Sequence, residues 1–558
     1  MNSRERGRER ARQAGPQDAP VAAPTAPPSS ATNAPVPPGD PTDRDTASAR
    51  LRGVLRATLS GARGGTVRLL ARVGRQRALA CTLVLLLLAS PWPPLTLLAL
   101  CAYIVVAFNQ PGLTTALIPL TAPFAYRPKD LLGPDFPVIE LLLLIALATS
   151  GLHLLLRWRR EARQGLGAAT LLDLWDEARK VLGTPFGLQA AALAALGAVS
   201  LLTVADPAHL RESLREYRTI VIEPVLFFFL ARLWLRDRER RTSAIAAFIG
   251  GAALVSLLAI GQVLTGQGVV AVEGVRRALG PYDHPNALAL YLLRAATFAI
   301  ALLALAPAPR RARPLLVATP LLLLALALTF SRGAWLGLAV GVALLGLAFG
   351  LRRAAPGLLL AGVIGVALLA LAGAGLNVFR EGGESLGLRR MIWGSTVAML
   401  RDHPAFGVGL DQFLTQYAPR YINPAAWGER YTSHPHNLLL DFWVRLGIMG
   451  FAWLVWTLTS LGLGVARAWH TAQGESRRLL LAAALACAAA LTHGLVDNFY
   501  FLIDLAFIWW LLLALLSIAT EDVAVAQSVT ETAPPAPPRR GRARGSRRRL
   551  STGTGAEG

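Results

Sequence analysis

The apolar residues of this 558-residue chain are gathered into long runs, and these runs constrain its fold more than any other feature. Most of them approach the roughly 20 residues that an α-helix needs to cross a hydrocarbon core of about 30 Å. Hydrophobic residues make up 54% of the chain and charged residues only 16%, whereas about a quarter of the residues in an average soluble domain are charged. The sequence therefore predicts an all-α, polytopic membrane bundle.

We expect about 12 to 14 spanning helices, because that many runs are long enough to form one. The first three runs are short and are interrupted by prolines such as Pro91, Pro94 and Pro111, so the lower number stays open. The candidate spans are 78–91, 94–108, 111–125, 136–156, 185–204, 217–235, 243–265, 286–306, 314–330, 333–350, 357–375, 437–465, 479–496 and 500–519.

Arginine-rich loops orient the predicted bundle. If the basic N-terminus lies in the cytoplasm, every second loop is short and rich in arginine, as positive charge on the cytoplasmic side of a membrane requires. We therefore predict a multi-pass protein of the bacterial inner membrane with both termini in the cytoplasm. The cytoplasmic loops are 157–163, 236–241, 310–313, 352–353 and 467–478. The outer segments are 126–135, 205–216, 266–285, 330–333, 376–436 and a short turn near Asp497.

Two basic tails flank the predicted membrane domain, which covers 76–520. Residues 1–75 and 521–558 are rich in Arg, Pro and Ala and cannot bury a core, so we predict disorder there. The net charge of +22 is concentrated in these tails and in the short loops. This distribution favours membrane orientation and contact with anionic lipids over nucleic acid binding. Cys81, Cys101 and Cys487 all lie inside apolar runs and indicate neither a disulfide nor a metal site.

The segment 376–436 is the longest predicted outer loop, and it is more than a linker. Leu388, Met391, Ile392, Thr396 and Met399 recur at helical spacing, which predicts an amphipathic helix near the membrane interface. Pro404 and the glycines that follow it end this helix.

Four outer-face features could carry chemistry. The first is Arg277 followed by Gly-Pro-Tyr-Asp-His-Pro-Asn286, which would otherwise be a turn and helix cap. The second is Ser331-Arg332-Gly333, in a turn of minimal length between two spans. Arg332 could be an anchor for lipid headgroups, but an arginine on the outer side opposes the charge rule and favours a functional role.

The third feature is Arg389-Arg390-Met-Ile-Trp393, followed by His403-Pro404 and Gly407-Val-Gly409; its alternative is an interfacial helix whose arginines contact headgroups. The fourth is His434-Pro-His436-Asn437, followed by Arg445-Leu-Gly-Ile-Met-Gly. Two histidines could be metal ligands, but no further ligands accompany them with zinc-like spacing. A single histidine acting as general base fits better, because imidazole titrates near neutral pH.

The order of these four features resembles the O-antigen ligase/polymerase family over roughly residues 80–520, most specifically at 277–450. The resemblance implies a helical membrane fold of the GT-C type with a large extracytoplasmic loop. It also implies an undecaprenyl-pyrophosphate-linked glycan donor, a glycolipid, glycan or protein acceptor, and no cofactor or metal. By motif position, the family's catalytic histidine falls on His436. Its arginines fall on Arg332 and on either Arg389 or Arg390. Arg445 departs from the family pattern, because many relatives carry an acidic residue there.

The residues themselves support this chemistry. A diphosphate leaving group needs its developing charge stabilised, and arginines can replace a metal because the guanidinium stays charged and binds phosphate oxygens in pairs. We expect His436 to accept the acceptor's proton while Arg332 and Arg389 or Arg390 hold the pyrophosphate. Further candidates for substrate binding are Arg277, Asn286, His434, Arg420, Arg430 and Asn437.

Three other functions stay open at this point. A polysaccharide polymerase of the same family shares all of these features with a ligase. A glycan or lipid transporter would show related halves with broken spans at matched positions, and the sequence shows no obvious repeat. A scaffolding membrane protein would not require the clustering of histidine and arginine.

Overall fold

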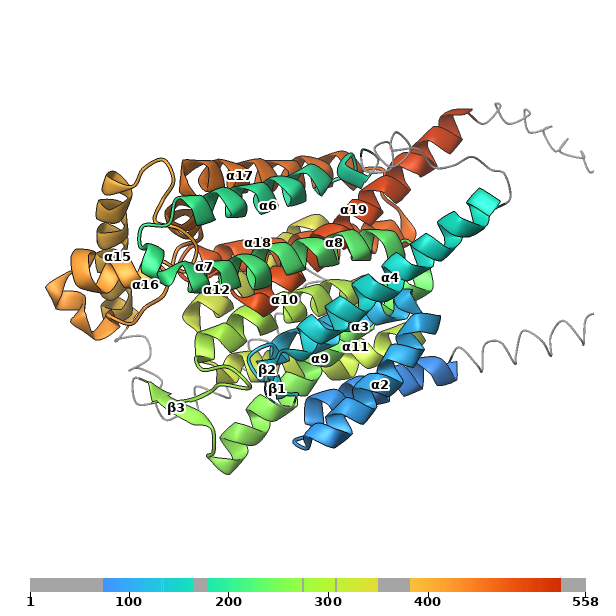
Figure 1. Cartoon of the computed structure of the whole chain (residues 1–558), viewed down its shortest axis with the longest axis horizontal. Coiled ribbons are helices and arrows are strands. Elements are labelled where there is room, and N and C mark those ends of the chain that lie inside the picture. The colour runs from blue at the N-terminus through green and yellow to red at the C-terminus, as the bar shows by residue number, and fades with distance from the viewer. Residues whose placement is uncertain are drawn as a thin grey trace, which may run out of the picture. The chain divides into compact units, whose positions relative to one another are not determined.

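The computed structural model describes residues 74–131, 133, 135–163, 179, 181–272, 275–306, 309–349 and 382–532 (Figure 1). These residues belong to one compact unit, Gly74–Gly558. The predicted span 357–375, the loop 352–353 and most of both predicted tails lie outside the described residues.

The described part of the chain is built of helices, as the sequence predicts. In chain order they are 74–89, α2 (Pro93–Asn109), α3 (Pro111–Thr121), η1 (Ala122–Phe124), α4 (Val138–Arg163), α6 (Gly187–Leu202), η2 (Pro207–His209), α7 (Leu210–Glu216), η3 (Tyr217–Ile222), α8 (Glu223–Trp234), α9 (Arg238–Thr265), α10 (Pro285–Ala304), α11 (Pro309–Leu328), α12 (Arg332–Phe349), α15 (Gly382–Asp402), α16 (Phe413–Gln416), η4 (Tyr417–Tyr421), η5 (Pro424–Glu429), α17 (Leu438–Trp469), α18 (Gly474–Gly494) and α19 (Ile503–Thr532). Two antiparallel hairpins lie in predicted outer segments, except that β2 reaches the first residue of the predicted span 136–156: β1 (Lys129–Asp130) with β2 (Asp135–Phe136), and β3 (Val269–Val272) with β4 (Val275–Ala278).

Every predicted span within the described residues coincides with a helix, which confirms the all-α polytopic class. By length and hydropathy, five of the described helices can cross a membrane: α4, α9, α10, α17 and α19. Four others, α2, α6, α11 and α12, are apolar but shorter. Helix α3 has only 11 residues and contains Pro119, so the proline-interrupted start of the bundle does not supply a full span at each predicted run. The total of 12 to 14 spans stays a prediction.

Helices α10 and α19 lie near the centre of the bundle. In the most apolar 18-residue stretches of these two helices, 78% and 89% of the residues are buried, whereas only half are buried in the corresponding stretches of α4 and α9. Helix α19 brings Trp509 and Trp510 into the core, where Trp510 contacts Phe228 and Trp453. A helix that is apolar on all sides and enclosed by others is typical of the middle of a membrane bundle, with the half-buried helices on its lipid-facing rim.

The predicted outer segments gather at one end of the bundle, where Figure 1 shows α7, α15, α16 and β3. Hydrogen bonds join them: the Ala205 amide donates to the carbonyl of Val408 at 2.8 Å, and the Ser213 hydroxyl donates to the carbonyl of Leu410 at 2.6 Å. We call this end of the bundle the loop end. It holds every candidate residue from the sequence that the structure describes.

Arginines of the predicted cytoplasmic loop 236–241 form ion pairs with glutamates of other predicted cytoplasmic segments. Arg236 contacts Glu521 at 2.8 Å, and Arg241 contacts Glu475 at 2.8 Å. Glu521 lies just past the predicted end of the membrane domain, and α19 continues to Thr532. Glu521 pairs with Arg232 of α8 and with Arg236 just after it, on the part of α19 that continues beyond the apolar run on which the boundary at 520 was based.

Helix α15 confirms the helix expected in the long outer loop, but its apolar face packs on protein. Ile392, Met399 and Leu400 form a small second core with Phe413 and Tyr417. These apolar side chains therefore pack against the loop segment 413–421 and fix the position of α15 at the loop end.

Helix α17 is broken at Gly447, whose φ of 69° and ψ of −171° only glycine adopts readily. The break frees two backbone groups, which the loop after α15 binds. The Val408 amide donates to the carbonyl of Val444 at 2.7 Å, and the Ile448 amide donates to the carbonyl of Ala405 at 3.1 Å. The glycines of the third and fourth sequence features thus form one structural joint. This joint positions α15 against the start of α17.

Replacing Gly447 by Ala should destabilise the protein. A Cβ at this position would lie 2.1 Å from the carbonyl oxygen of Ala405, and the backbone conformation itself costs a non-glycine residue about 1–3 kcal/mol. We expect a lower midpoint of thermal unfolding for Gly447→Ala in detergent, measured by size-exclusion chromatography of heated samples. Gly464→Ala, in the same helix with open space around its Cβ, is the matched control and should not lower the midpoint. An unchanged midpoint for Gly447→Ala would contradict this account of the joint.

Candidate functional site

Asp497 lies at the centre of the loop end, in the connection between α18 and α19. It is buried, and side chains from three other segments converge on its carboxylate. The Asn286 amide donates to Oδ2 at 2.9 Å, and an Arg389 guanidinium nitrogen lies 3.3 Å from the same oxygen. His436 Nδ1 lies 3.2 Å from Oδ1. A buried carboxylate needs such partners to remain charged.

His436 is held in a strained conformation immediately before α17. Its φ of 53° lies in the left-handed region, which non-glycine residues seldom adopt. Asn437 follows it as the N-cap and accepts from the amides of Leu439 and Leu440. The Asn437 side-chain amide also donates to the carbonyl of Leu495 at 3.0 Å, which ties the start of α17 to the segment that carries Asp497. Strain of this kind is kept where the surroundings impose it, and it is frequent at functional sites.

The two ring nitrogens of His436 have different environments. When Nδ1 carries the hydrogen and donates to Asp497, Nε2 holds the free lone pair. The Thr432 hydroxyl lies 3.2 Å from Nε2, and its single hydrogen can go either to this nitrogen or to the carbonyl of His434. The pairing with Asp497 thus orients the imidazole so that its basic nitrogen points away from the buried carboxylate.

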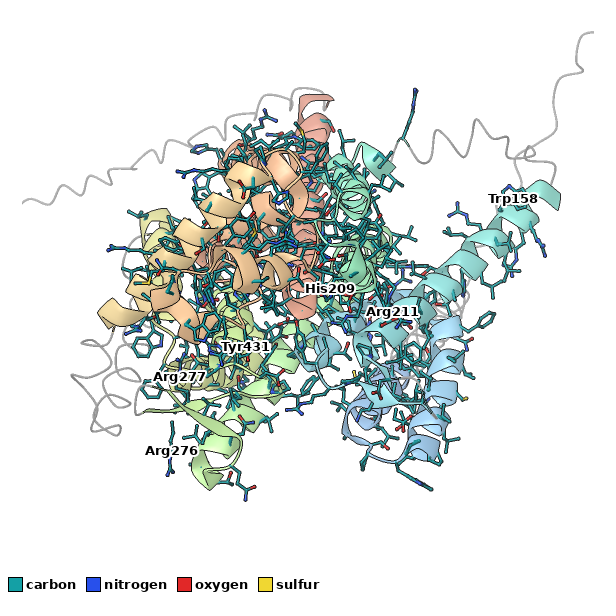
Figure 2. All side chains as sticks on the ribbon, turned by 60° about the vertical axis from the view of Figure 1, so that its left-hand side comes forward. Trp158, His209, Arg211, Arg276, Arg277 and Tyr431 are labelled. Atoms are coloured by element: carbon teal, nitrogen blue, oxygen red, sulfur yellow. The ribbon has the colours of Figure 1, made fainter. Side chains whose placement is uncertain are left out.

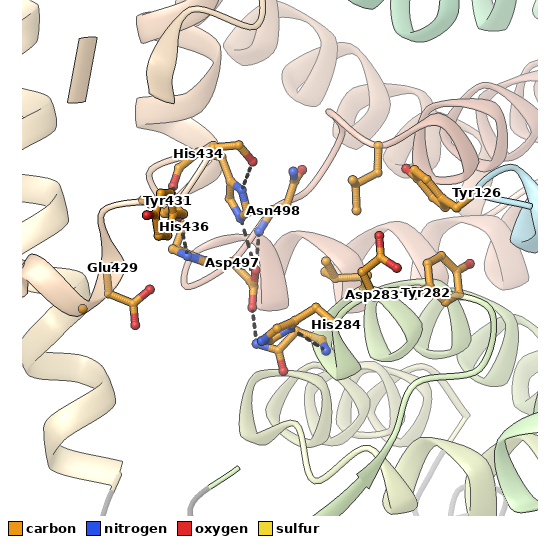
Figure 3. Close-up of a pocket in the computed structure, with 17 residues that line it drawn as sticks. Tyr126, Tyr282, Asp283, His284, Glu429, Tyr431, His434, His436, Asp497 and Asn498 are labelled. Carbon is orange, nitrogen blue, oxygen red and sulfur yellow. Dashed lines mark hydrogen bonds and ion pairs between the residues drawn. The ribbon is translucent and has the colours of Figure 1, made fainter. Parts of the chain in front are cut away.

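A cavity of about 630 Å³ opens beside this pair (Figure 3). Its walls come from the segment before α10, from the loop 428–436, from the α18–α19 connection and from Tyr126. Carboxylates, histidines and tyrosines make up most of its polar lining: Tyr126, Tyr282, Asp283, His284, Glu429, Tyr431, His434, His436 and Asp497. We call it the acidic cavity.

A second cavity of about 240 Å³ carries the arginines, and we call it the arginine cavity. Arg277, Arg332 and Arg389 line it, together with Ser331 and Gly333 of the α11–α12 turn. The two cavities share His284, Asn286, Glu429 and His436 as lining residues. His436 is therefore accessible from both a space rich in cations and a space rich in acids.

Arg277 is fixed by the fold rather than exposed on a loop. Its Nε donates to the carbonyl of Thr329 at 2.6 Å, and its terminal nitrogen donates to Asn286 Oδ1 at 2.8 Å. Asn286 in turn donates to Asp497, so these three residues form a chain of hydrogen bonds. The neighbouring Arg276 is exposed on the same strand, because successive side chains of a strand point to opposite faces (Figure 2).

The Ser331-Arg332-Gly333 turn packs directly on His493 at the end of α18. A Cβ on Gly333 would lie 2.5 Å from the His493 ring, so only glycine permits this approach. The Ser331 hydroxyl lies 3.4 Å from His493 Nε2, and the same nitrogen lies 3.8 Å from Asp497. The packing at Gly333 brings Arg332 to the arginine cavity.

Arg390, Arg420 and Arg430 lie elsewhere. Arg390 is exposed on α15 and borders a different surface hollow, with Met391 and Tyr421. Arg420 donates to Gln416 at 2.7 Å. Arg430 stacks on the rings of Trp427 and Tyr431. The structure thus separates Arg389 from Arg390, which the sequence could not do, and it gives Arg420 and Arg430 local partners.

Arg445, the departure from the family pattern, is buried among acids. It contacts Asp441 at 2.8 Å and Glu216 at 2.6 Å, and it donates to the carbonyl of Ser433 at 2.8 Å. The bond to Ser433 supports the loop that carries His434 and His436. Arg445 therefore helps to position the loop that carries these two histidines.

A metal could be held by His434, His436 and Asp497, whose donor atoms lie within 4.8 Å of one another. These are the kinds of ligand that zinc accepts. The sequence argument against a metal rested on the lack of a third ligand near the two histidines. The fold supplies that ligand from 61 residues further along the chain, so spacing alone does not exclude a metal, and a metal-free site stays a prediction.

Asp497, Asp283 and Glu429 are site residues that the sequence analysis missed. The turn near Asp497 was recognised only as a short outer turn. The argument applied to Arg332, that a charged residue in a minimal turn between two spans is seldom accidental, holds equally for Asp497. Asp283 and Glu429 gave no comparable signal, because acidic residues are ordinary in outer loops.

Electrostatics keep Asp497 ionised and two of its neighbours neutral. Burial alone would raise the pKa of Asp497, but the imidazoles of His434 and His436 hold it well below its usual value. Burial lowers the pKa of His434, and the neighbouring His436 acts in the same direction. Burial lowers the pKa of His284 to about 4, although the charge of Asp497 opposes this shift. At neutral pH the site therefore carries a fixed negative charge beside two uncharged imidazoles.

Replacing Asp497 by Asn should destabilise the loop end, because the cationic Arg389 loses its charged partner. We expect a loss of about 1–3 kcal/mol at pH 7. The folded-state pKa of Asp497 lies below the ordinary value of 3.8, so its contribution is complete above that pH and falls as the pH drops through the folded-state pKa. Thermal midpoints of wild type and variant should differ by a constant amount from about pH 8 to pH 5 and converge in stronger acid. A gap that widens on acidification would rule out this role.

Comparison with known proteins gives one family match. Residues 317–455 match the family model described as O-Antigen ligase. This range runs from α11 through the arginine cavity and α15 to the first half of α17, and so includes Arg332, Arg389 and His436. No curated protein matches the chain.

Proposed function

We propose, from the premise that the chain belongs to the O-antigen ligase family, that it transfers a glycan from a lipid-pyrophosphate carrier to an acceptor hydroxyl. The family match assigns a membrane glycan transferase in general terms. Our proposal adds the carrier, of the undecaprenyl-pyrophosphate type, and the outer face of the inner membrane as the place of reaction. The observation that carries it is His436, paired with a buried carboxylate, on the wall between an arginine cavity and a second, larger cavity.

The arginine cavity is the proposed site of the donor's pyrophosphate. Arg277, Arg332 and Arg389 approach it from three different segments of the chain. Guanidinium groups bind phosphate oxygens in pairs and stay charged at any physiological pH. Held by the fold before the substrate arrives, they stabilise the charge that develops on the leaving diphosphate. On this proposal no divalent cation is needed.

His436 is the proposed general base. The acceptor hydroxyl oxygen attacks the anomeric carbon of the donor sugar, and a new glycosidic bond forms. The bond from that carbon to the pyrophosphate oxygen breaks, and the electron pair leaves with the carrier diphosphate. His436 Nε2 takes the hydroxyl proton, while Asp497 holds Nδ1–H and stabilises the imidazolium.

The ligase and the polymerase differ only in the acceptor. A ligase transfers the glycan once, to a different molecule, whereas a polymerase extends one carrier-linked glycan with another. Reconstitution with a lipid-pyrophosphate oligosaccharide separates them by product size: a single larger product indicates ligation, and a ladder of products indicates chain growth. A transporter would move the donor across the bilayer without forming any glycosidic bond.

Replacing His436 by Ala should abolish transfer in proteoliposomes that contain the lipid-pyrophosphate oligosaccharide and candidate acceptors. A positioned base contributes about 10²–10⁴-fold to the rate, so the variant's product should fall to background. The assay is run in EDTA, because the proposal requires no metal. His403→Ala, just past the C-terminal end of α15, is the control and should retain activity. Normal transfer by His436→Ala, or loss of wild-type transfer in EDTA, would overturn the base or the metal-free mechanism respectively.

Replacing Arg389 by Ala should lower kcat far more than replacing Arg390. Arg389 lines the arginine cavity beside Asp497, whereas Arg390 is exposed and borders another hollow. Loss of one donor that stabilises developing charge costs about 10²–10³ in kcat. The two variants remove the same charge from adjacent positions, so initial rates at saturating donor isolate the effect of position. Equal losses in both variants would contradict the assignment.

A further inference from the structure

We infer that the acidic cavity holds the acceptor glycan and favours an uncharged or amino-bearing sugar over an anionic one. The inference rests on the proposed function, since it assigns the second substrate of the same site. The observations that carry it are the placement of the arginines in only one of the two cavities and the position of His436, which lines both.

The arginines belong to only one of the two cavities. Three of them line the arginine cavity, whereas no arginine or lysine is among the described residues that line the acidic cavity. Asp283, Glu429 and Asp497 line the acidic cavity, and Glu429 borders the arginine cavity as well. The diphosphate of the donor has a clear place in the first. An anionic acceptor would face repulsion in the second.

The His284 ring does not offset these acids at neutral pH, because burial lowers its pKa to about 4. The nearest arginine in sequence, Arg430, is not among the residues that line the cavity; its guanidinium lies 4.4 Å from the Tyr431 ring centre and donates to the carbonyl of Trp427. Among the described residues, no arginine of this loop borders the cavity.

Asp283 and Glu429 are available to a ligand. Neither carboxylate forms an ion pair with any residue that the structure describes, in contrast to Asp497 and Glu216. In Figure 3, Glu429 and Asp283 lie on either side of the His436–Asp497 pair. Carboxylates in this arrangement accept hydrogen bonds from sugar hydroxyls and attract a protonated amine.

Aromatic rings complete the surface that a neutral sugar would contact. Tyr282 donates its hydroxyl to Asp504 at 2.8 Å, and the Tyr126 hydroxyl accepts from the Ile503 amide at 3.0 Å. The two rings lie 5.7 Å apart at one end of the cavity, and Tyr431 is exposed at the other. Since the hydroxyls of Tyr126 and Tyr282 have protein partners, their rings form a fixed wall. Aromatic walls with a few convergent polar groups are typical of small-ligand sites.

The position of His436 assigns the acidic cavity to the acceptor. His436 lines both cavities, so a hydroxyl in the acidic cavity can reach Nε2 while the diphosphate lies among the arginines. The acceptor hydroxyl reaches the anomeric carbon either from the side opposite the leaving diphosphate or from the same side. The acidic cavity is the larger of the two spaces that border this imidazole.

The test measures binding before turnover. A panel of common trisaccharides is prepared in three forms that differ only at one terminal position: hydroxyl, amine or carboxylate. Binding to full-length, detergent-purified protein is measured by calorimetry without donor. We expect the carboxylate form to bind about tenfold more weakly than the hydroxyl form, with the amine form at least as tight as the hydroxyl form. Equal binding of all three, tighter binding of the carboxylate form, or no binding of any overturns the inference.

Variants of the two carboxylates test whether they cause the weaker binding of the carboxylate form. Asp283→Asn and Glu429→Gln should each narrow the difference between the hydroxyl and carboxylate forms. Glu212→Gln removes the same charge from exposed α7, also at the loop end, and should leave the difference unchanged. A preference that survives in both cavity variants overturns the inference. Transfer is then assayed with the same acceptors. Absence of transfer with the charge preference intact contradicts the proposed function alone, and transfer without the preference contradicts this inference alone.

Discussion

The buried carboxylate of Asp497 is the interaction on which the loop end depends. It receives Asn286 from the start of α10, Arg389 from α15 and His436 from the loop before α17, and His493 lies close to it on α18. Each of these segments could otherwise move separately, because loops at a bundle end have few apolar contacts to hold them. A buried charge needs polar partners or must be neutralised. The carboxylate of Asp497 therefore stabilises an arrangement in which Arg389 and His436 lie close together. The hydrogen bond between Asp497 and Nδ1 also leaves Nε2 of His436 with its free lone pair.

Glycines make this convergence sterically possible. Gly333 lets the α11–α12 turn approach His493, and Gly447 opens α17 so that the loop after α15 can bond to its backbone. The contact at Gly333 positions Arg332, and the joint at Gly447 positions the helix that carries Arg389. The strained φ of His436 is maintained between them. A rigid site of this kind suits charge stabilisation, which is most effective when the donors are oriented before the substrate binds.

Much of the fold was predictable from the sequence because its signal is local. Apolar runs of spanning length became helices wherever the structure describes them, and the periodic spacing of Ile392, Thr396 and Met399 became α15. The partner of that helix was not predictable. An apolar stripe looks the same whether it meets lipid or protein, and the contact with Phe413 and Tyr417 depends on a loop that folds back on α15. The amphipathic helix was thus assigned correctly as a helix, and its position near the membrane interface stays a prediction.

The candidate site divides in the same way. The sequence by itself predicted that His436, Arg332 and an arginine at 389 or 390 lie together, because motif order and loop charge are local features of the chain, and the structure brings His436, Arg332 and Arg389 to one cavity. Only the tertiary structure decided between Arg389 and Arg390, since adjacent residues on a helix point about 100° apart and only one of them meets Asp497. It also supplied Asp497 and divided the surroundings of His436 into a basic and an acidic space. The contacts of Asp497 join residues more than 60 positions apart. No local sequence pattern indicates which distant side chains will contact a buried charge.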